Sequence, residues 1–238
     1  YSREDLIHLM SRDSDGFNRW EASQQLSLSM IMACVTEYQY RSNILTFTPF
    51  GNLLDAYRCI LADKSLDQAM VAYMLTLPSE AYVSELVDQV DVEAIHYGRM
   101  AVRKALAREL RDDFLAIYSS YDHQQVYAAT AEAIARRSLK NVALSYLMLL
   151  NEDAIIQSCE QQYPSANNMT DVIAALSQLV NSESTTAQKI ATTALADFYQ
   201  RWQHESLVVN QWLSLQAGCL LPNTLDRVKS LLNHPGYD

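Results

Sequence analysis

Apolar residues recur every three or four positions along most of this chain, which is the spacing of one face of an α-helix. The clearest row lies between about residues 91 and 121, where the apolar positions fall four apart: Val102, Leu106, Leu110, Phe114 and Tyr118. The same periodicity predicts helices over about residues 2–10, 17–38, 49–61, 65–77, 91–121, 127–150, 152–162, 170–181, 185–203, 206–217 and 222–233. We therefore predict about eleven helices and an all-α protein.

Local signals place several of the helix ends. Ser2 is a possible N-cap of the first helix, and Gly16 interrupts the pattern before the second. Ser65-x-x-Gln68 has the form of a capping box, and Pro78 is expected to end the helix that follows it. Residues 40–49 are irregular and have room for a short extended piece before Pro49 opens the next helix.

Short connections between successive helices favour antiparallel packing of neighbours. The predicted architecture is an irregular α-solenoid, a superhelix of HEAT or armadillo type, although no fixed repeat period is visible. No shift of composition marks an internal boundary, so we expect residues 1–238 to form one helical domain. Residues 142–150 are apolar almost all round and should lie centrally in it.

The composition narrows the range of partners. Apolar residues make up 49% of the chain and charged residues 19%, which is typical of a globular protein. The net charge of −10 argues against nucleic-acid binding and against an anionic membrane surface. No apolar run approaches the roughly 18–20 residues of a membrane span. The four cysteines lack a C-x-x-C pair and are expected to be buried free thiols, as in a cytoplasmic protein.

Catalytic and metal-binding patterns are missing from the sequence. None of the five histidines has a second histidine four residues away, and "HESLV" at 204–208 departs from H-E-x-x-H at Val208. There is no G-x-S-x-G, and the glycines never cluster into a phosphate-binding loop. We therefore expect no catalytic residue, no metal ligand and no cofactor in this chain.

Two features leave a choice between structure and function. A basic group forms either a solvated helix face, with Arg108 paired to Asp112, or a docking surface for an acidic partner; it comprises Arg99, Arg103, Lys104, Arg108 and Arg111. Two segments each place a tryptophan and polar groups on one helix, "FNRWEASQQL" (17–26) and "VVNQWLSLQA" (208–217). Core packing accounts for both, with the wall of a ligand site as the alternative.

The stretch "PSANNMTD" (164–171) is a good helix start. Either Asn168 or Thr170 can act as the N-cap, and Asp171 suits the positive end of the helix dipole. The doubled asparagine and the methionine have no such explanation.

Several stretches, taken in order, resemble one known family. They are "SDGFNRWEASQQL" (14–26), "LPSE" (77–80), "RRSLKNVALSYL" (136–147), "ANNMTDVIAAL" (166–176), "FYQRW" (198–202), "LVVNQWLSLQA" (207–217) and a final "HPGY". Together they are similar to the C-terminal helical domain of bacterial aminopeptidase N, the alanyl aminopeptidases among the gluzincin zinc peptidases. The resemblance covers essentially the whole chain.

This resemblance implies a parent enzyme that removes N-terminal amino acids from peptides by means of Zn²⁺ held in a separate catalytic domain. The helical domain would cover that domain, form an internal chamber and restrict the access of substrates. Its partners would be the catalytic domain of the same polypeptide and, in the parent, peptide substrates. Because the family continues past "HPGYD" with an Asn-Pro-Asn-Arg stretch, the domain is expected to be truncated at its C-terminal end.

The resemblance also marks candidate residues for the chamber or for contacts between domains. These are Arg19, Trp20, Glu21, Lys140, Asn141, Asn167, Asn168, Asp171, Trp212 and Gln216. The rival hypothesis is an independent α-solenoid adaptor that binds a protein partner in its groove, and composition and periodicity alone do not separate the two.

Overall fold

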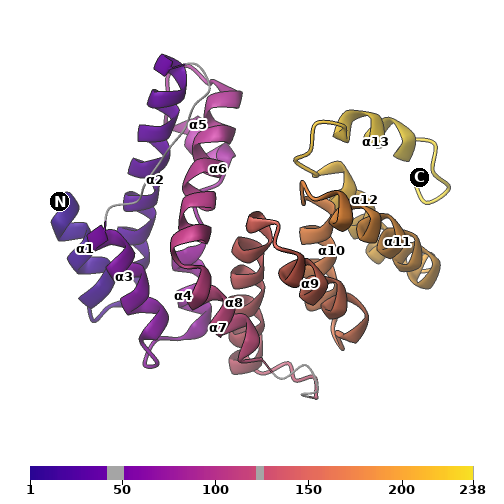
Figure 1. The fold of residues 1–238 in the computed structure, drawn as a ribbon, viewed down its shortest axis with the longest axis horizontal. Coiled ribbons are helices and arrows are strands. Elements are labelled where there is room, and N and C mark those ends of the chain that lie inside the picture. The colour runs from indigo at the N-terminus through magenta and orange to yellow at the C-terminus, as the bar shows by residue number, and fades with distance from the viewer. Residues whose placement is uncertain (42–50, 122–125, 238) are drawn as a thin grey trace. The chain divides into compact units, whose positions relative to one another are not determined.

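The computed structural model describes residues 1–41, 51–121 and 126–237. Every regular element among them is a helix, with thirteen α-helices and one short 3-10 helix (Figure 1). The prediction of an all-α protein is therefore confirmed. The helices group into two compact units, an N-terminal unit of residues 1–121 and 128–150 and a C-terminal unit made chiefly of residues 151–237. The prediction that residues 1–238 form a single domain stays a prediction.

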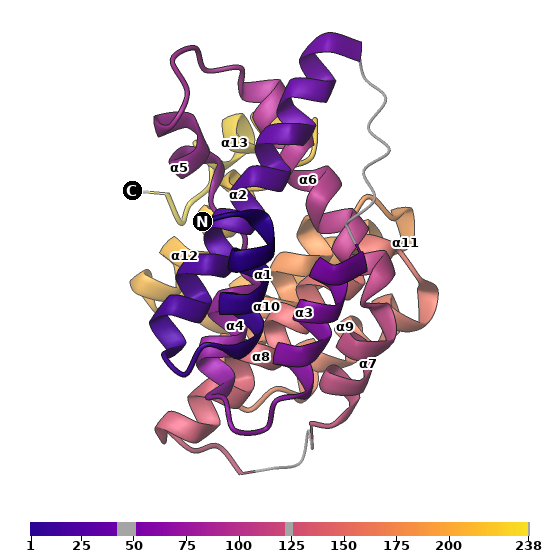
Figure 2. The same cartoon turned by 90° about the vertical axis from the view of Figure 1, so that its left-hand side faces the viewer.

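The N-terminal unit contains eight α-helices. They are α1 (Arg3–Arg12), α2 (Gly16–Arg41), α3 (Gly51–Ala62), α4 (Gln68–Leu75), α5 (Glu80–Glu85), α6 (Val92–Glu109), α7 (Arg111–Ser119) and α8 (Ala131–Leu147), followed by the 3-10 turn Met148–Leu150. The long helices α2 and α6 lie side by side, and α8 packs on α4 and α7 (Figure 1, Figure 2). The core of the N-terminal unit includes fully buried Tyr57, Leu106 and Leu144. In the same core, Phe114 stacks on Tyr146 with ring centroids 4.7 Å apart.

The row between residues 91 and 121 is buried as predicted, but it belongs to two helices. All five of its apolar side chains are at most 4% exposed. Leu110 ends α6 and precedes α7 with φ −108° and ψ 19°. The hydrogen-bond ladder nevertheless continues, because the Leu110 N–H donates to the Leu106 carbonyl and the Phe114 N–H to the Leu110 carbonyl, both at 2.9 Å. One residue thus bends the chain without changing which face is apolar.

The predicted capping box at Ser65 and Gln68 is wrong. The N-cap of α4 is Asp67, whose carboxylate accepts the Ala69 N–H at 3.0 Å. Ser65 instead donates its hydroxyl to Asp63 at 2.6 Å. A carboxylate directly beside the first turn is a good acceptor for the orphan N–H groups, and here it takes the place assigned to the serine.

Other helix ends differ less from the expectation. Ser2 and Asp5 cap α1 reciprocally, as the sequence indicated for Ser2. Gly16 does not interrupt a helix but begins α2, where the Asp15 carboxylate accepts the Phe17 N–H at 2.7 Å. The helix before Pro78 ends earlier, at Leu75. The irregular piece predicted for residues 40–49 lies almost entirely outside the described residues.

The C-terminal unit stacks its helices in chain order. They are α9 (Asp153–Ser165), α10 (Met169–Val180), α11 (Thr185–Trp202), α12 (Ser206–Ala217) and α13 (Thr224–Leu231). Each packs on the next along the chain, as in helical repeats (Figure 1). A core cluster joins α10 to α13, formed by Leu176, Ala194, Phe198, Trp212 and Leu231, and Tyr163 of α9 packs against it. Among the described residues, no helix has the length and apolarity that crossing a membrane requires.

Gly98 sets the close approach of α2 and α6. A Cβ atom at this position would lie 3.0 Å from Val35 Cγ2, 3.1 Å from Val35 N and 3.2 Å from the Ile31 carbonyl oxygen. Two of these atoms belong to the backbone of α2 and cannot move aside. We expect Gly98→Ala to lower the free energy of unfolding by about 1–2 kcal/mol, measured by chemical denaturation.

The matched control for this prediction is Gly51→Ala in α3. A Cβ atom there would meet nothing within 4 Å. Alanine also has the higher helix propensity, so this change should be neutral or stabilise by up to about 1 kcal/mol. Equal effects of the two substitutions would contradict the proposed close contact.

Candidate functional site

Arg19 is a buried link between three helices of the N-terminal unit. The residue is 6% exposed, and its Nε donates to the Met10 carbonyl at 3.1 Å. Its terminal nitrogens donate to the Ser11 carbonyl at 3.3 Å and to the Asp63 carboxylate at 3.2 Å. A guanidinium stays charged and is tolerated in a core only with such acceptors. Arg19 therefore holds α1 and the end of α3 against α2.

The two candidates next to Arg19 are more accessible. Trp20 is half-buried, and its ring lies 5.5 Å from that of Phe17 one turn earlier. Glu21 is also half-buried and accepts a hydrogen bond from the Gln25 amide at 2.9 Å. Both contacts lie within α2, so the structure gives neither residue a partner from another helix among the contacts described.

The stretch Leu77–Glu80 fastens α5 to α6. Ser79 is the N-cap of α5 and accepts the Tyr82 N–H at 3.1 Å. The Pro78 carbonyl accepts Arg99 Nε at 2.7 Å. The Glu80 carboxylate lies 3.0 Å from His96 Nδ1 on α6. The "LPSE" stretch that supported the family resemblance therefore forms helix caps and interhelical hydrogen bonds.

Part of the basic group on α6 faces neighbouring elements. Burial lowers the pKa of Arg99, with the charge of Arg103 as a second cause. Arg103 donates to the Ser145 carbonyl at 3.4 Å, and its guanidinium lies 5.6 Å from the Tyr146 ring. These two side chains therefore do not belong to a solvated face. Asp112 pairs with Arg111 at 2.7 Å.

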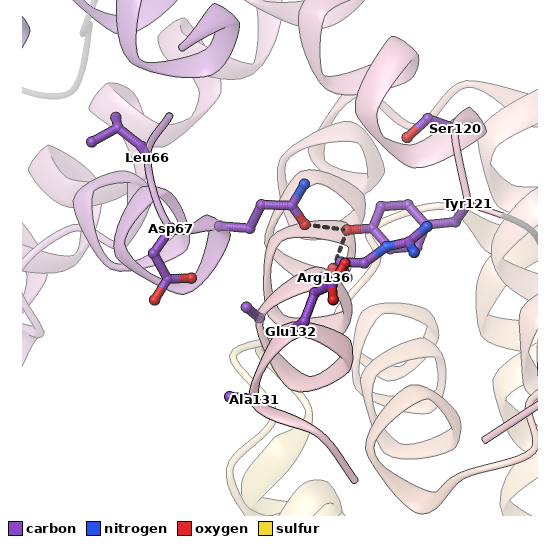
Figure 3. A pocket seen from close by; sticks show the side chains of 9 residues that line it. Leu66, Asp67, Ser120, Tyr121, Ala131, Glu132 and Arg136 are labelled. Atoms are coloured by element: carbon purple, nitrogen blue, oxygen red, sulfur yellow. Dashed lines mark hydrogen bonds between the residues drawn. The ribbon is translucent and has the colours of Figure 1, made fainter. Parts of the chain in front are cut away.

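Lys140 is buried on α8 beside a tyrosine. It is 4% exposed, and its Nζ lies 5.8 Å from the centroid of the Tyr121 ring. The guanidinium of Arg136 stands 5.5 Å from the same ring. The Tyr121 hydroxyl contacts the Arg136 carbonyl and lies 3.4 Å from Gln68 Oε1 (Figure 3). The neighbouring candidate Asn141 is half-buried on α8.

This tyrosine lines a cavity of about 550 Å³ in the N-terminal unit. We call it the Tyr121 cavity. Its lining comes from the start of α4, the residues after α7 and the start of α8: Leu66, Asp67, Gln68, Ser120, Tyr121, Ala131, Glu132, Ala135 and Arg136. Figure 3 shows Leu66 and Asp67 on one side and Glu132, Arg136 and Tyr121 on the other. None of these residues was predicted from the sequence as a site candidate.

The "PSANNMTD" stretch is a helix cap. Asn168 is the N-cap of α10, and its Oδ1 accepts the Asp171 N–H at 3.0 Å. Its amide nitrogen donates to the Asp171 carboxylate at 3.0 Å and to the side-chain oxygen of Asn167 at 3.2 Å. Asp171 is 6% exposed, and its carbonyl accepts the buried Gln162 amide at 3.0 Å. Of the two predicted caps, Asn168 is correct and Thr170 is not.

This assignment predicts the effects of two neighbouring substitutions. Asn168→Ala should lower the free energy of unfolding by about 1 kcal/mol, because a helix N–H loses its acceptor. Thr170→Ala, at an exposed position one residue into the helix, should change it by less than about 0.5 kcal/mol. Urea denaturation of both variants measures the difference, and a larger loss at Thr170 would reverse the assignment.

Trp212 is the centre of an aromatic cluster in the C-terminal unit. It is 6% exposed and donates its Nε1–H to the Leu195 carbonyl at 2.9 Å. Its ring lies 5.0 Å from Tyr199 and 4.9 Å from His234. A Cβ atom at Gly236 would stand 3.1 Å from the Tyr199 ring, so glycine fits this place. Gln216 is buried and donates to the Trp212 carbonyl at 3.2 Å.

The ten candidates are divided between the two units. Those up to Asn141 belong to the N-terminal unit and the others to the C-terminal unit. In the C-terminal unit, Asn168 bonds to both Asn167 and Asp171, and Gln216 bonds to Trp212. Whether any of them faces a chamber or another domain stays a prediction. Their observed contacts are helix caps, hydrogen bonds between helices and core packing.

The described residues offer few groups for chemistry. Within them, no three His, Cys, Asp or Glu side chains are grouped closely enough to hold a metal ion. All four thiols are free, as predicted. Cys34, Cys159 and Cys219 are buried as expected, but the prediction of burial is wrong for Cys59, which is exposed. Burial raises the pKa of Cys159 to about 12 and that of Cys34 to about 11, so these thiols stay protonated at neutral pH.

The sequence of this chain matches a known helical family. A family model described as a domain of unknown function (DUF3458_C) with ARM repeats matches residues 3–238. The chain belongs to this family. The repeat type agrees with the predicted HEAT or armadillo architecture.

The relatives of this chain are aminopeptidases. Aminopeptidase N of Escherichia coli is 35% identical over 238 residues, which is 100% of this chain and 26% of that protein. Aminopeptidase N of Haemophilus influenzae is 32% identical over 239 residues, with the same coverage of 100% and 26%. The expected resemblance to aminopeptidase N is confirmed. The chain spans about a quarter of the length of these relatives.

A solved structure shows the same fold. In the crystal structure of Legionella pneumophila aminopeptidase A in complex with aspartic acid, the matching part is 30% identical and superposes with a TM-score of 0.83. The match covers 100% of this chain and 28% of that one. The helical arrangement described above therefore occurs inside a larger aminopeptidase.

Proposed function

We propose that this chain is the non-catalytic helical domain of a cytoplasmic zinc aminopeptidase, in which it covers the active site and limits which peptides enter. The observation that carries the proposal is the match of the whole chain to about a quarter of aminopeptidase N. The catalytic domain of the same polypeptide would hold the zinc and cleave the first peptide bond. Peptides are the substrates of that whole enzyme.

The sequence stretches that carry the family resemblance make contacts that support a scaffolding role. Arg19 joins three helices, Asn168 caps α10 and Trp212 fills the core of the C-terminal unit. The polar groups of all three side chains make hydrogen bonds within the chain. Such residues stabilise a shaped surface and leave the chemistry to another part of the enzyme.

The test measures catalysis and metal content on this chain alone. We expect no hydrolysis of an alanyl chromogenic substrate above the buffer rate, and less than stoichiometric zinc by elemental analysis. Zinc-dependent turnover or one bound zinc per chain would overturn the proposal. A stable native complex with a protein unrelated to the catalytic domain would instead favour an independent adaptor.

A further inference from the structure

The Tyr121 cavity brings together charged groups that do not neutralise one another. Arg136 is half-buried, and its guanidinium makes no hydrogen bond or ion pair with any described residue; its one described contact is with the face of the Tyr121 ring. A guanidinium has five N–H donors in a planar fork that suits a carboxylate. The contact with a ring face leaves that fork available to an acceptor within the cavity.

Two carboxylates lie at the same cavity. Glu132 is placed four residues before Arg136 on α8, the spacing at which such side chains commonly pair, yet no ion pair joins them. Asp67 accepts the Ala69 N–H as the cap of α4 and has no cationic partner among the described residues. In Figure 3, Asp67 stands on the far side of the cavity from Glu132 and Arg136. The cavity therefore presents one cationic and two anionic positions.

The rest of the lining is suited to a small organic molecule. The Tyr121 ring, Leu66, Ala131 and Ala135 supply apolar surface, and Gln68 supplies an amide. A volume of about 550 Å³ falls within the range of roughly 300–1,000 Å³ that is typical of ligand pockets. A simple anion would meet repulsion from Asp67 and Glu132, and a simple cation would meet Arg136. A molecule that carries both charges satisfies all three side chains.

We propose that the Tyr121 cavity binds a short zwitterionic peptide, with its carboxylate on Arg136 and its ammonium group between Glu132 and Asp67. The choice of a peptide among zwitterions rests on the proposed function, since peptides are what an aminopeptidase encounters and releases. The requirement for both charges is set by the side chains of Arg136, Glu132 and Asp67, which line the cavity.

The experiment titrates the full chain with L-alanyl-L-alanine and with two blocked forms, the dipeptide amide and the N-acetyl dipeptide, by calorimetry and by ¹H–¹⁵N NMR. We expect saturable binding of the dipeptide with shifts at Gln68 and Tyr121, and roughly tenfold weaker binding of the amide, because its carboxylate is missing. The N-acetyl dipeptide should also bind more weakly, because its ammonium group is missing.

Variants assign the binding to these side chains. Arg136→Gln should weaken the dipeptide roughly tenfold or more, whereas Arg12→Gln, an exposed arginine on α1, should leave it unchanged. Ala131→Phe should block binding by filling the cavity, and its circular dichroism spectrum reports whether it has folded. Equal binding by wild type and Arg136→Gln, equal binding of the blocked and free peptides, or no saturable binding would overturn the site. The chain could fail to bind the dipeptide and still restore activity when it is added to the catalytic part of its parent enzyme. That result would rule out only this site and would leave the proposed function standing.

Discussion

Trp212→Ala is expected to lower the free energy of unfolding of the C-terminal unit by about 3–5 kcal/mol, the typical cost of removing a buried aromatic side chain. Trp212 is 6% exposed, and its ring packs against Tyr199 and His234. Its removal leaves a cavity in the core cluster and deprives the Leu195 carbonyl of its donor. Hydrogen exchange followed by mass spectrometry measures the loss in peptides from α11 and α12.

Trp202→Ala is the matched control. Trp202 is the last residue of α11 and is 37% exposed, and its indole ring has no described ring or hydrogen-bond partner. Its removal should change the stability by less than about 0.5 kcal/mol. Equal losses of protection in the two variants would show that Trp212 does not organise this core.

Arg19→Ala is expected to lower the stability of the N-terminal unit by about 3 kcal/mol. The substitution leaves the Met10 and Ser11 carbonyls without their donor and the Asp63 carboxylate without its cation. The side chain of Asp63 is 31% exposed and keeps its hydrogen bonds to Ser65, which limits the loss of stability. Exchange protection in α1 should fall most, because α1 is held to α2 through these bonds.

Two further variants separate the geometry of Arg19 from its charge. Arg19→Lys keeps the charge but has no planar fork to reach three acceptors, so most of the loss should remain. Arg12→Ala removes an exposed arginine of α1 and should change the stability by less than about 0.5 kcal/mol. Full stability of Arg19→Lys would show that charge alone matters at this position.

Helical periodicity predicted the buried rows of this protein well. Leu106 and Phe114 lie in the core where the spacing placed them. The break at Leu110 was not visible, because the apolar face and the hydrogen-bond ladder both continue through it. The capping box at Ser65 failed for a different reason, since Asp67 competes for the same orphan N–H groups and lies closer to the helix.

Contacts between distant segments could not be read from the sequence. Arg19 and Asp63 are 44 positions apart, and the Tyr121 cavity is assembled from three separate stretches between Leu66 and Arg136. Local pattern carries no information on such distances. The "PSANNMTD" stretch was the reverse case: its local chemistry predicted Asn168 as one of two caps, and only the structure showed Asp171 bonding back to it.

The most direct test of the proposed function adds this chain to the separately produced catalytic part of its parent aminopeptidase. The measurement compares hydrolysis of a short alanyl substrate with that of a long peptide before and after the addition. We predict that the chain forms a stable complex, raises turnover of the short substrate and lowers the relative rate on the long one. No complex, or an unchanged ratio of the two rates in a complex, would contradict the proposal that this domain covers the active site and restricts access to it.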